Sequence, residues 1–307
     1  CTGRRNIHFT AGTTSMARNR FFGLTSRVLM LIVAGLLILS YASIVVNPAK
    51  VWLISLVGIF FVPLSVLNFI LLLWALKRRS KSFMIPLLAL LPAFFFVGRY
   101  VQVDSDEDRI ARMSHTGNTL KVVSYNVGRF ALDKGEFSSR SDCADSVFAF
   151  ILDQDPDIIC LQEFHTSDVD NIRSLLRRRM SDYKAEYYLF PSGNGAFGNI
   201  TLSRIPVKNK GVIKFDGSAN LAIYTDYSHN GCDFRVYNCH FESYNISFSG
   251  IARAMMSSEK DLFAETGIKM RRSISRRPKQ VDKVFHDIES CPVESFVCGD
   301  FNDNPMS

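Results

Sequence analysis

The feature that most constrains this 307-residue sequence is a first third with long uncharged apolar stretches and no acidic residue. Residues 28–46 and 51–76 are both long enough to cross a bilayer, since a helical span needs about 20 apolar residues. Residues 83–98 are shorter, so a third span needs Arg99 to reach back to the membrane surface. A signal peptide is a poor explanation of the first stretch, because two more apolar stretches follow it. Buried helices of a water-soluble protein are a poor explanation too, because three such helices would rarely lack every acidic residue. We therefore expect three transmembrane helices within residues 28–101.

The charges of the chain are divided between its two parts. Eleven of the 36 Lys and Arg residues lie in residues 1–100, and all 29 Asp and Glu residues follow, so the first third carries +11 and the rest −4. Positive charge beside apolar stretches sets membrane orientation, whereas nucleic-acid binding needs it on the soluble domain. The pI of about 9.0 therefore does not indicate a nucleic-acid partner, which stays possible. No feature indicates a protein partner.

Basic residues also predict the orientation in the membrane. Three arginines lie within residues 18–27, and four basic residues lie within 77–81, between the second and third apolar stretches. Loops rich in Lys and Arg stay in the cytoplasm. Residues 1–27 are thus expected to be a cytoplasmic segment, and the chain after Val101 is expected on the periplasmic side of the cell inner membrane. Without the third span, the domain would instead be cytoplasmic.

After the apolar region the pattern changes to that of an α/β domain, residues 120–307. Residues 102–119 are polar and acidic, which predicts a solvated linker. Strands are expected at 120–127, 157–163, 198–203, 221–226, 233–240 and 295–298. Apolar residues at helical spacing predict helices at 144–152, 168–180 and 281–288. Residues 243–274 are expected to be loop with partial helix, and the basic run 269–279 a solvated face, with substrate binding as the alternative.

Polar residues stand at or just after the carboxyl ends of several expected strands. They are Asn126, Glu163, His240, Asp300 and Asn302. One such residue alone is more typical of a turn. Their recurrence matters, because strand ends bring distant residues to one rim of a sheet, where sites are commonly built.

These residue types suit the hydrolysis of a phosphate ester. The carboxylate of Glu163 is a hard oxygen ligand for Mg²⁺ or Mn²⁺, which would polarise a phosphoryl oxygen. Asp300 could orient or deprotonate the attacking water. His240, if protonated, could contact the phosphate. The amides of Asn126 and Asn302 could bind water, the cation or phosphate oxygens.

The residues around these positions form an ordered set of short motifs: Ser124-Tyr125-Asn126-Val127, Leu161-Gln162-Glu163, Gly198-Asn199 through Leu202-Ser203-Arg204, Asn238-Cys239-His240 through Glu242-Ser243, and Gly299-Asp300-Phe301-Asn302-Asp303. The set resembles the successive signature motifs of the endonuclease/exonuclease/phosphatase superfamily. The apolar leader is similar to that of membrane-anchored bacterial members, especially from the Bacteroidetes group.

The resemblance implies a deoxyribonuclease-like, four-layered α/β sandwich with two central sheets, here preceded by three transmembrane helices. It implies that Glu163 is the principal metal ligand, with Asn126 nearby. His240 matches the phosphate-contacting histidine, Asp300 the water-orienting aspartate and Asn302 the amide that stabilises the transition state. The resemblance further implies supporting roles for two residues, Asn199 and Asn238.

Both ends of the sequence differ from what the resemblance implies for a whole protein. The family carries a further Asp-His pair in a Ser-Asp-His-like motif, and none follows Asp303 before the end at Ser307. His286 lies within an expected helix and is no substitute. We expect this chain to be a C-terminally truncated piece, inactive as it stands. Residue 1 is not Met, and Met16 is expected to be the natural start, with a lipidated Cys1 as the alternative.

The function expected of the full-length protein is that of a Mg²⁺-dependent (or Mn²⁺-dependent) enzyme that hydrolyses phosphate esters and is an integral membrane protein. It could be a phosphodiesterase, a phosphatase or a nuclease. Its substrate stays open between nucleic acid, lipid and inositol phosphate. The alternative is a non-catalytic binding module or truncated pseudoenzyme on the same fold. A transporter is less favoured, because the expected spans contain no charged residue that could mark a pathway.

Overall fold

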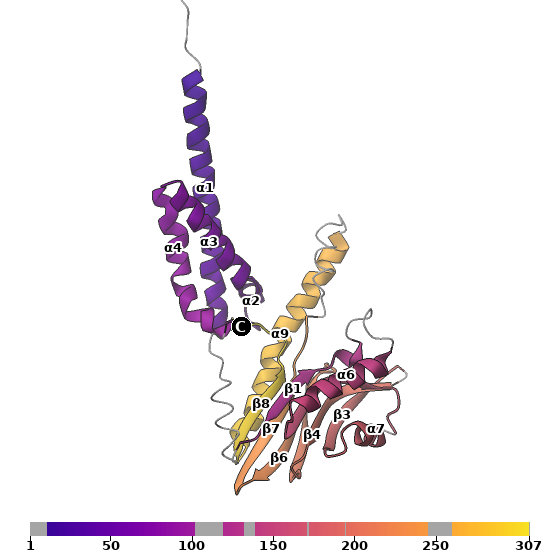
Figure 1. Cartoon of the computed structure of the whole chain (residues 1–307). Coiled ribbons are helices and arrows are strands. Elements are labelled where there is room, and N and C mark those ends of the chain that lie inside the picture. The colour runs from indigo at the N-terminus through magenta and orange to yellow at the C-terminus, as the bar shows by residue number, and fades with distance from the viewer. Residues whose placement is uncertain are drawn as a thin grey trace, which may run out of the picture. The chain divides into compact units, whose positions relative to one another are not determined.

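The computed structural model describes residues 11–101, 119–131, 139–170, 172–193, 195–244 and 260–306. The chain divides into two compact units, residues 1–104 together with 304–307, and residues 105–303. The first unit is helical, and the second is mixed α/β (Figure 1). The expected linker at 102–119 lies almost entirely outside the described residues.

The helical unit contains two segments that are long and apolar enough to cross a membrane. They are Leu24–Ile44 and Lys81–Arg99, and a third candidate arises if a bent pair of helices counts as one span. The helices are α1 (Ala11–Tyr41), α2 (Trp52–Ile59), α3 (Phe61–Lys77) and α4 (Met84–Leu90), with 3₁₀ segments η1 (Ala42–Ile44), η2 (Lys81–Phe83) and η3 (Pro92–Arg99).

The apolar stretch 51–76, expected as one span, is broken. Helices α2 and α3 meet at an angle of 59°. Pro63 explains the break, because it has no N–H to donate to the carbonyl of Ile59, four residues earlier. Conversely, the stretch that was marginal in the sequence lies within the 19-residue apolar segment Lys81–Arg99, which becomes a 3₁₀ helix from Pro92 onward.

Helix α1 packs against α3 and α4, with Leu37 and Ala89 in the shared core. The buried amide of Asn68 donates to the carbonyl of Val33 at 3.2 Å and so ties α3 to α1. Elsewhere the unit turns large apolar side chains outward; Phe95, for example, is 83% exposed. Such a surface is unfavourable in water and suits contact with lipid.

The second unit is built around two four-stranded sheets, in the orders β1-β2-β4-β3 and β5-β6-β7-β8 (Figure 1). Its strands are β1 (Val122–Asn126), β2 (Ile158–Thr166), β3 (Lys184–Ser192), β4 (Gly195–Ser203), β5 (Asn209–Lys214), β6 (Leu221–His229), β7 (Cys232–His240) and β8 (Glu294–Asp300). Its helical segments are η4 (Gly128–Phe130), α6 (Arg140–Asp153), α7 (Ile172–Arg179) and α9 (Lys260–Ser290). The pairs β1–β2 and β7–β8 are parallel, and the other paired strands are antiparallel.

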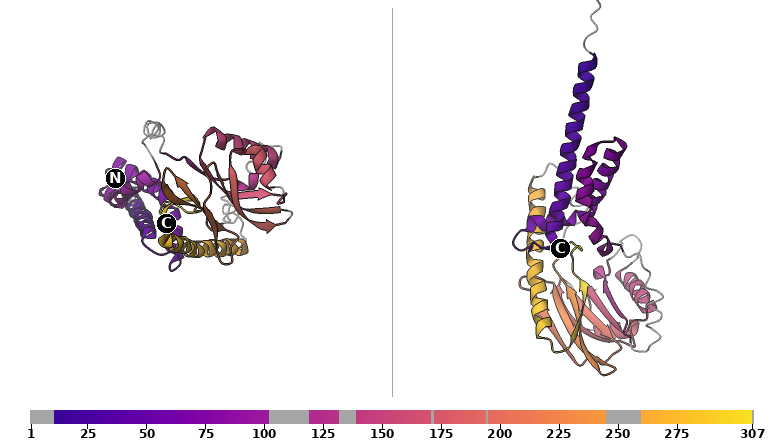
Figure 2. Two further views of the ribbon diagram at one scale, coloured as in Figure 1. Left: turned by 90° about the horizontal axis from the view of Figure 1, so that it is seen from below. Right: turned by 90° about the vertical axis from the view of Figure 1, so that its left-hand side faces the viewer.

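The two sheets face each other and helices cover their outer faces (Figure 2). Strand β2 shows how the layers arise, because its side chains alternate between two cores. Ile159 and Leu161 pack under α6, while Ile158 and Cys160 face the second sheet. On the far side, Val284 of α9 packs on the outer face of the second sheet. The expected mixed α/β fold with two sheets is confirmed.

Several boundaries differ from those that the sequence predicts. Strand β2 does not end at Glu163 but continues to Thr166, with a register shift between Leu161 and Phe164. Helix α9 runs through residues 260–274, expected as loop with partial helix, whereas residues 245–259 lie outside the described part of the chain. Strands β3 and β5, which are edge strands, were not predicted. Most side chains of β3 are half-buried, so they do not show the alternation of buried and exposed residues that reveals a strand.

Candidate active site

Four of the predicted site residues come together where the two parallel strand pairs end. Asn126 ends β1, and its side-chain amide donates to the Glu163 carboxylate at 3.2 Å and to the Asp300 carboxylate at 2.7 Å. The Nε2 atom of His240 lies 3.7 Å from Glu163 Oε1. One amide therefore joins a carboxylate from each sheet, with the imidazole beside them.

Backbone register places these residues at one rim. Asn126 lies opposite Gln162 in the β1–β2 pair, and His240 lies opposite Asp300 in the β7–β8 pair. Glu163 comes one residue later in β2, at the register shift, with a left-handed φ of 52°. In a regular strand successive side chains point to alternate faces of the sheet. The bulge interrupts this alternation, and the Glu163 carboxylate lies toward Asn126.

The close approach of β8 to β7 depends on Gly299, directly before Asp300. Its φ is +139°, a conformation that residues with a Cβ rarely adopt. A Cβ at this position would lie 1.9 Å from the carbonyl oxygen of Cys239. The glycine of this motif is therefore needed to bring Asp300 level with His240.

The imidazole of His240 is buried, and its Nε2 has no hydrogen-bond partner among the described residues. Burial lowers the pKa of His240, because the charged imidazolium loses its hydration, although Glu163 and Asp300 oppose this shift. The lowered pKa favours a neutral ring, which has one N–H donor and one acceptor nitrogen. A neutral ring can still donate one hydrogen bond, and the phosphate contact of His240 in its protonated form stays a prediction.

Asn199 and Asn238 lie deeper, between the sheets. Asn238 donates to the carbonyls of Ile200 at 2.9 Å and Leu161 at 3.2 Å, and it accepts from Gln162 Nε2 at 2.8 Å. Asn199 donates to the carbonyl of Asn238 at 3.0 Å. These buried amides join the two sheets below the rim, and Gln162, which the sequence placed in a motif without assigning it a role, belongs with them.

The side chain of Asn302 has a different environment from the other four. Its amide donates to the carbonyl of Phe241 at 2.9 Å, and its backbone N–H donates to Asp300 Oδ1 at 2.9 Å. Within the described part of the chain no hydrogen bond joins its side chain to Asn126, Glu163 or His240. The structure therefore places Asn302 at the rim as part of the loop that carries Asp300.

Arg129 is a neighbour of the site that the sequence did not single out. Its Nε lies 3.7 Å from Glu163 Oε2, and its guanidinium lies over the ring of Phe197 at 4.4 Å. The residue follows β1 in a left-handed conformation, with a φ of 58°. An exposed arginine in a turn gives no sequence signal, so only the fold reveals that it faces the carboxylates.

The donor set fits a small hard cation. Within the described residues no group of three or more His, Cys, Asp and Glu side chains is arranged to hold a metal ion. Mg²⁺, however, usually binds through only one or two protein carboxylates and keeps several waters. Glu163 supplies one such carboxylate, the amide of Asn126 joins it to the carboxylate of Asp300, and His240 Nε2 lies 3.7 Å from Glu163 Oε1. Oxygen ligands of this kind favour Mg²⁺ or Mn²⁺.

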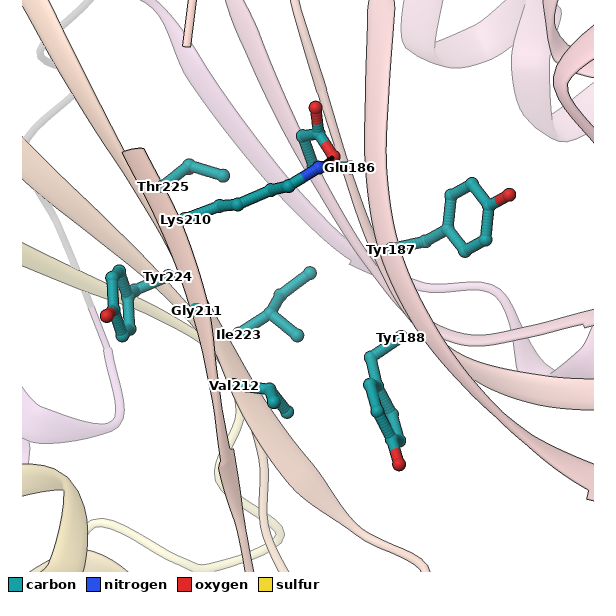
Figure 3. A pocket seen from close by; sticks show the side chains of 9 residues that line it. All are labelled: Glu186, Tyr187, Tyr188, Lys210, Gly211, Val212, Ile223, Tyr224 and Thr225. Carbon is teal, nitrogen blue, oxygen red and sulfur yellow. Dashed lines mark hydrogen bonds and ion pairs between the residues drawn. The ribbon is translucent and has the colours of Figure 1, made fainter. Parts of the chain in front are cut away.

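A separate hollow lies between the two sheets at strands β3, β5 and β6, with a volume of about 180 Å³ (Figure 3). Figure 3 shows Lys210 reaching toward Glu186 across it, with Ile223 and Val212 on one wall and Tyr188 on the other. Strands β3 and β5 are the edges farthest in each sheet from β1 and β8. None of the predicted site residues lines this hollow, so it is distinct from the candidate active site.

The signature of a known family extends over most of the second unit. Residues 123–307, more than half of the chain, match the model of the endonuclease/exonuclease/phosphatase family. The chain belongs to this family. Family members are phosphodiesterases, nucleases or phosphatases. Residues 19–100 match a second model, described as a domain of unknown function (DUF8431). No curated protein matches the chain.

Solved structures of the endonuclease/exonuclease/phosphatase family are similar to the chain at low sequence identity. A humanized TDP2 from D. rerio is 21% identical, with a TM-score of 0.40 over 60% of this chain and 62% of that one. A family protein from Leptotrichia buccalis is 13% identical, with a TM-score of 0.39 over 60% and 67%. ANGEL2, a 2′,3′-cyclic phosphatase, is 18% identical, with a TM-score of 0.40 over 61% and 53%. The chain spans about three fifths of the length of the TDP2 structures that it matches.

Proposed function

We propose that the protein is a divalent-cation-dependent phosphoesterase that is anchored in a membrane. The observation that carries this proposal is the joining of Glu163 and Asp300 by the amide of Asn126, with the buried His240 beside them. Membership of the family supports hydrolysis of a phosphate ester. The deoxyribonuclease-like four-layered sandwich, with residues 120–307 as its domain, belongs to the same proposal.

A bound Mg²⁺ or Mn²⁺ would polarise the phosphoryl oxygen and offset the charge that develops during attack. Glu163 and Asn126 are the residues proposed to hold it. Asp300 takes a proton from water as the water oxygen bonds to phosphorus. The P–O ester bond breaks, and the leaving oxygen takes a proton from solvent and departs as an alcohol. The N–H of His240 donates to a phosphate oxygen, and Asn302 keeps the Asp300 loop at the rim through its bonds to Asp300 and Phe241.

Turnover of bis(p-nitrophenyl) phosphate tests this proposal. The protein is expressed from its complete coding sequence, purified in detergent and stripped of cations with EDTA. Hydrolysis is expected only after addition of Mg²⁺ or Mn²⁺. Cation binding without hydrolysis of this or of lipid, nucleotide and inositol phosphates would instead support a binding module on the same fold.

The membrane anchor is the second part of the proposal. It is supported by the apolar segments Leu24–Ile44 and Lys81–Arg99, by the bent pair α2–α3 and by the basic residues beside them. If residues 1–27 are cytoplasmic and the chain crosses the membrane three times, the second unit lies outside the cytoplasm. Protease added to spheroplasts is then expected to digest the α/β unit while it spares a cytoplasmic marker. Full protection of the α/β unit until lysis would reverse the orientation.

The substrate class is not indicated by charge. The chain after residue 100 carries a net −4, which is unlike the basic surface of a strong nucleic-acid binder. A solved TDP2 from D. rerio is in complex with a single-stranded DNA product, and ANGEL2 acts as a 2′,3′-cyclic phosphatase. A membrane anchor favours a substrate that is a lipid or another component of the cell envelope.

A further inference from the structure

Helix α9 buries a polar face, which is unusual for a helix in the outer layer of a fold. Ser273, Arg277 and Gln280 are each no more than 4% exposed, and they follow one another at spacings of four and three residues. Residues at this spacing share one face of a helix. Arg277 therefore does not belong to a solvated basic face, as the sequence suggested for residues 269–279, whereas Arg271 and Arg272 of the same run are exposed and Arg276 is half-buried.

The first contacts of this polar face are with the loop that follows β7 and His240. Ser273 Oγ donates to the carbonyl of Ser243 at 2.8 Å. Gln280 Oε1 accepts from the backbone N–H of Glu242 at 2.8 Å. Arg276 lies 3.3 Å from the carboxylate of Glu242. The helix thus holds the backbone immediately after His240 through contacts spread over two of its turns.

Arg277 also reaches the loop that follows β8 and Asp300. Its Nη1 donates to the carbonyl of Asn302 and lies 2.8 Å from Asp303 Oδ2. Its guanidinium lies over the ring of Tyr244, 4.3 Å from the centroid, in the loop after His240. A single side chain therefore contacts both loops that directly follow the candidate catalytic residues His240 and Asp300.

Stability alone does not explain a buried guanidinium at this position. Desolvation of a cation costs several kcal/mol, and apolar residues of similar volume often stabilise a core as well or better. Here the Nε and Nη2 atoms of Arg277 are buried without a hydrogen-bond partner among the described residues, which adds to the cost. Meanwhile the carbonyl that Arg277 holds belongs to Asn302, which has a left-handed φ of 51°. A strained backbone of this kind persists only where its surroundings fix it.

We propose that Arg277 is a positioning residue of the candidate active site, which fixes the loop 301–303 so that Asp300 stays against Asn126 and His240. This inference rests on the proposed function for its catalytic consequence. Its structural part, the immobilisation of the loop by the guanidinium, stands without it. The planar guanidinium matters, because its Nη1 contacts both a carbonyl and a carboxylate while its face covers the ring of Tyr244.

The test compares Arg277→Gln, Arg277→Lys and the control Arg271→Gln, an exposed position on the same helix, in the detergent-purified protein. Arg277→Gln is expected to lower kcat about 100-fold with KM changed less than about three-fold, since a misplacement of about 1 Å at a reacting group has this effect. Arg277→Lys, which keeps the charge but not the planar group that covers the ring of Tyr244, is expected to recover only part of the loss. Arg271→Gln is expected to match the wild type.

A second readout follows the loop without activity. Hydrogen–deuterium exchange of residues 299–303 reports the bond from Asn302 N–H to Asp300 Oδ1 and is expected to become at least ten-fold faster in Arg277→Gln but not in Arg271→Gln. Unchanged exchange would overturn the positioning role, whatever the activity. Faster exchange with kcat within two-fold of the wild type would overturn its catalytic consequence.

Failure of the proposed function is distinguishable from failure of this inference. If the wild type hydrolyses no phosphate ester with any cation, the proposed function fails, and the exchange measurement alone decides whether Arg277 holds the loop. Circular dichroism and thermal unfolding check each variant. If Arg277→Gln does not fold, Arg277→Lys carries the same comparison, and wild-type exchange rates in Arg277→Lys would count against the role of the planar guanidinium.

Discussion

The two parallel strand pairs of the α/β unit bring their polar residues to the rim in different ways. In the β1–β2 pair, Glu163 is placed by the backbone, through a bulge with a left-handed residue inside a strand that continues to Thr166. In the β7–β8 pair, His240 and Asp300 face each other in regular register, and the loops beyond them are held by polar side chains of α9.

The helices behind the two pairs differ accordingly. Helix α6 covers the first sheet with an apolar face that includes Val147 and Ile151, so its contribution is apolar packing. Helix α9 packs with Val284 but also buries Ser273 and Arg277 against the loops. The first sheet thus places Glu163 through its own backbone, whereas the loops beyond the second sheet depend on long-range side-chain contacts.

The largest effect is expected from the first pair. Glu163→Gln keeps the size and the bulge but removes the charge that would bind the cation. Loss of several kcal/mol of charge stabilisation corresponds to a fall in kcat/KM of about 1,000-fold or more. Steady-state hydrolysis of bis(p-nitrophenyl) phosphate with Mg²⁺ measures it. Glu186→Gln, on β3 of the same sheet, is the control and is expected to keep wild-type turnover; equal turnover in Glu163→Gln would remove Glu163 from the cation site.

The second pair is most sensitive at Gly299. Gly299→Ala adds a Cβ that meets the carbonyl of Cys239 and forces a φ of +139° on a residue with a side chain. The expected loss is about 3 kcal/mol of unfolding free energy, together with the register that aligns Asp300 with His240. Thermal unfolding of the detergent-purified protein measures this loss. Gly267→Ala, in α9 with open space at its Cβ, is the matched control and is expected to be neutral or slightly stabilising. Equal behaviour of both variants would mean that β7 and β8 separate more easily than their packing indicates.

The same contrast explains what the sequence could predict. Asn126, His240 and Asp300 each end a strand with a clear apolar pattern, and the structure brings them together with Glu163. Their grouping at one rim followed from the strands alone. The bulge at Glu163 could not be predicted, because it depends on how β2 pairs with β4, far along the chain.

The sequence predicted only the C-terminal part of helix α9, residues 281–288, because the rest of the helix lacks an apolar pattern. The helical pattern in the sequence comes from apolar residues such as Val281 and Val284, and it vanishes toward the N-terminal half, where the buried face is Ser273 and Arg277. Periodicity of apolar residues cannot reveal a helix that buries polar ones. Contacts with Asn302 and Ser243 make that burial possible, and they exist only in the folded chain.

The bridge between the two pairs is tested by Asn126→Asp. This variant replaces the amide that joins Glu163 and Asp300 with a third carboxylate, so the three negative charges repel one another. Without divalent cations the expected loss is about 2 kcal/mol of unfolding free energy. Millimolar Mg²⁺ is expected to restore most of it, as measured by thermal unfolding in EDTA and in Mg²⁺. Asn209→Asp, beside Asp226 on an exposed part of β5, is the control. If Mg²⁺ rescues neither variant, or both equally, the rim does not hold the cation.

The smallest effect isolates the polar face of α9. Ser273→Ala removes one buried hydrogen bond, to the carbonyl of Ser243, and is expected to lower the unfolding free energy by about 1 kcal/mol. For a unit of this size the melting temperature then falls by about 2–4 °C. Ser290→Ala, on the same helix, removes an exposed bond to the carbonyl of Asp287 and is expected to stay within about 0.5 kcal/mol of the wild type. If the two serine variants melt together, the polar contacts of α9 add nothing to its apolar packing, and the second strand pair is as self-supporting as the first.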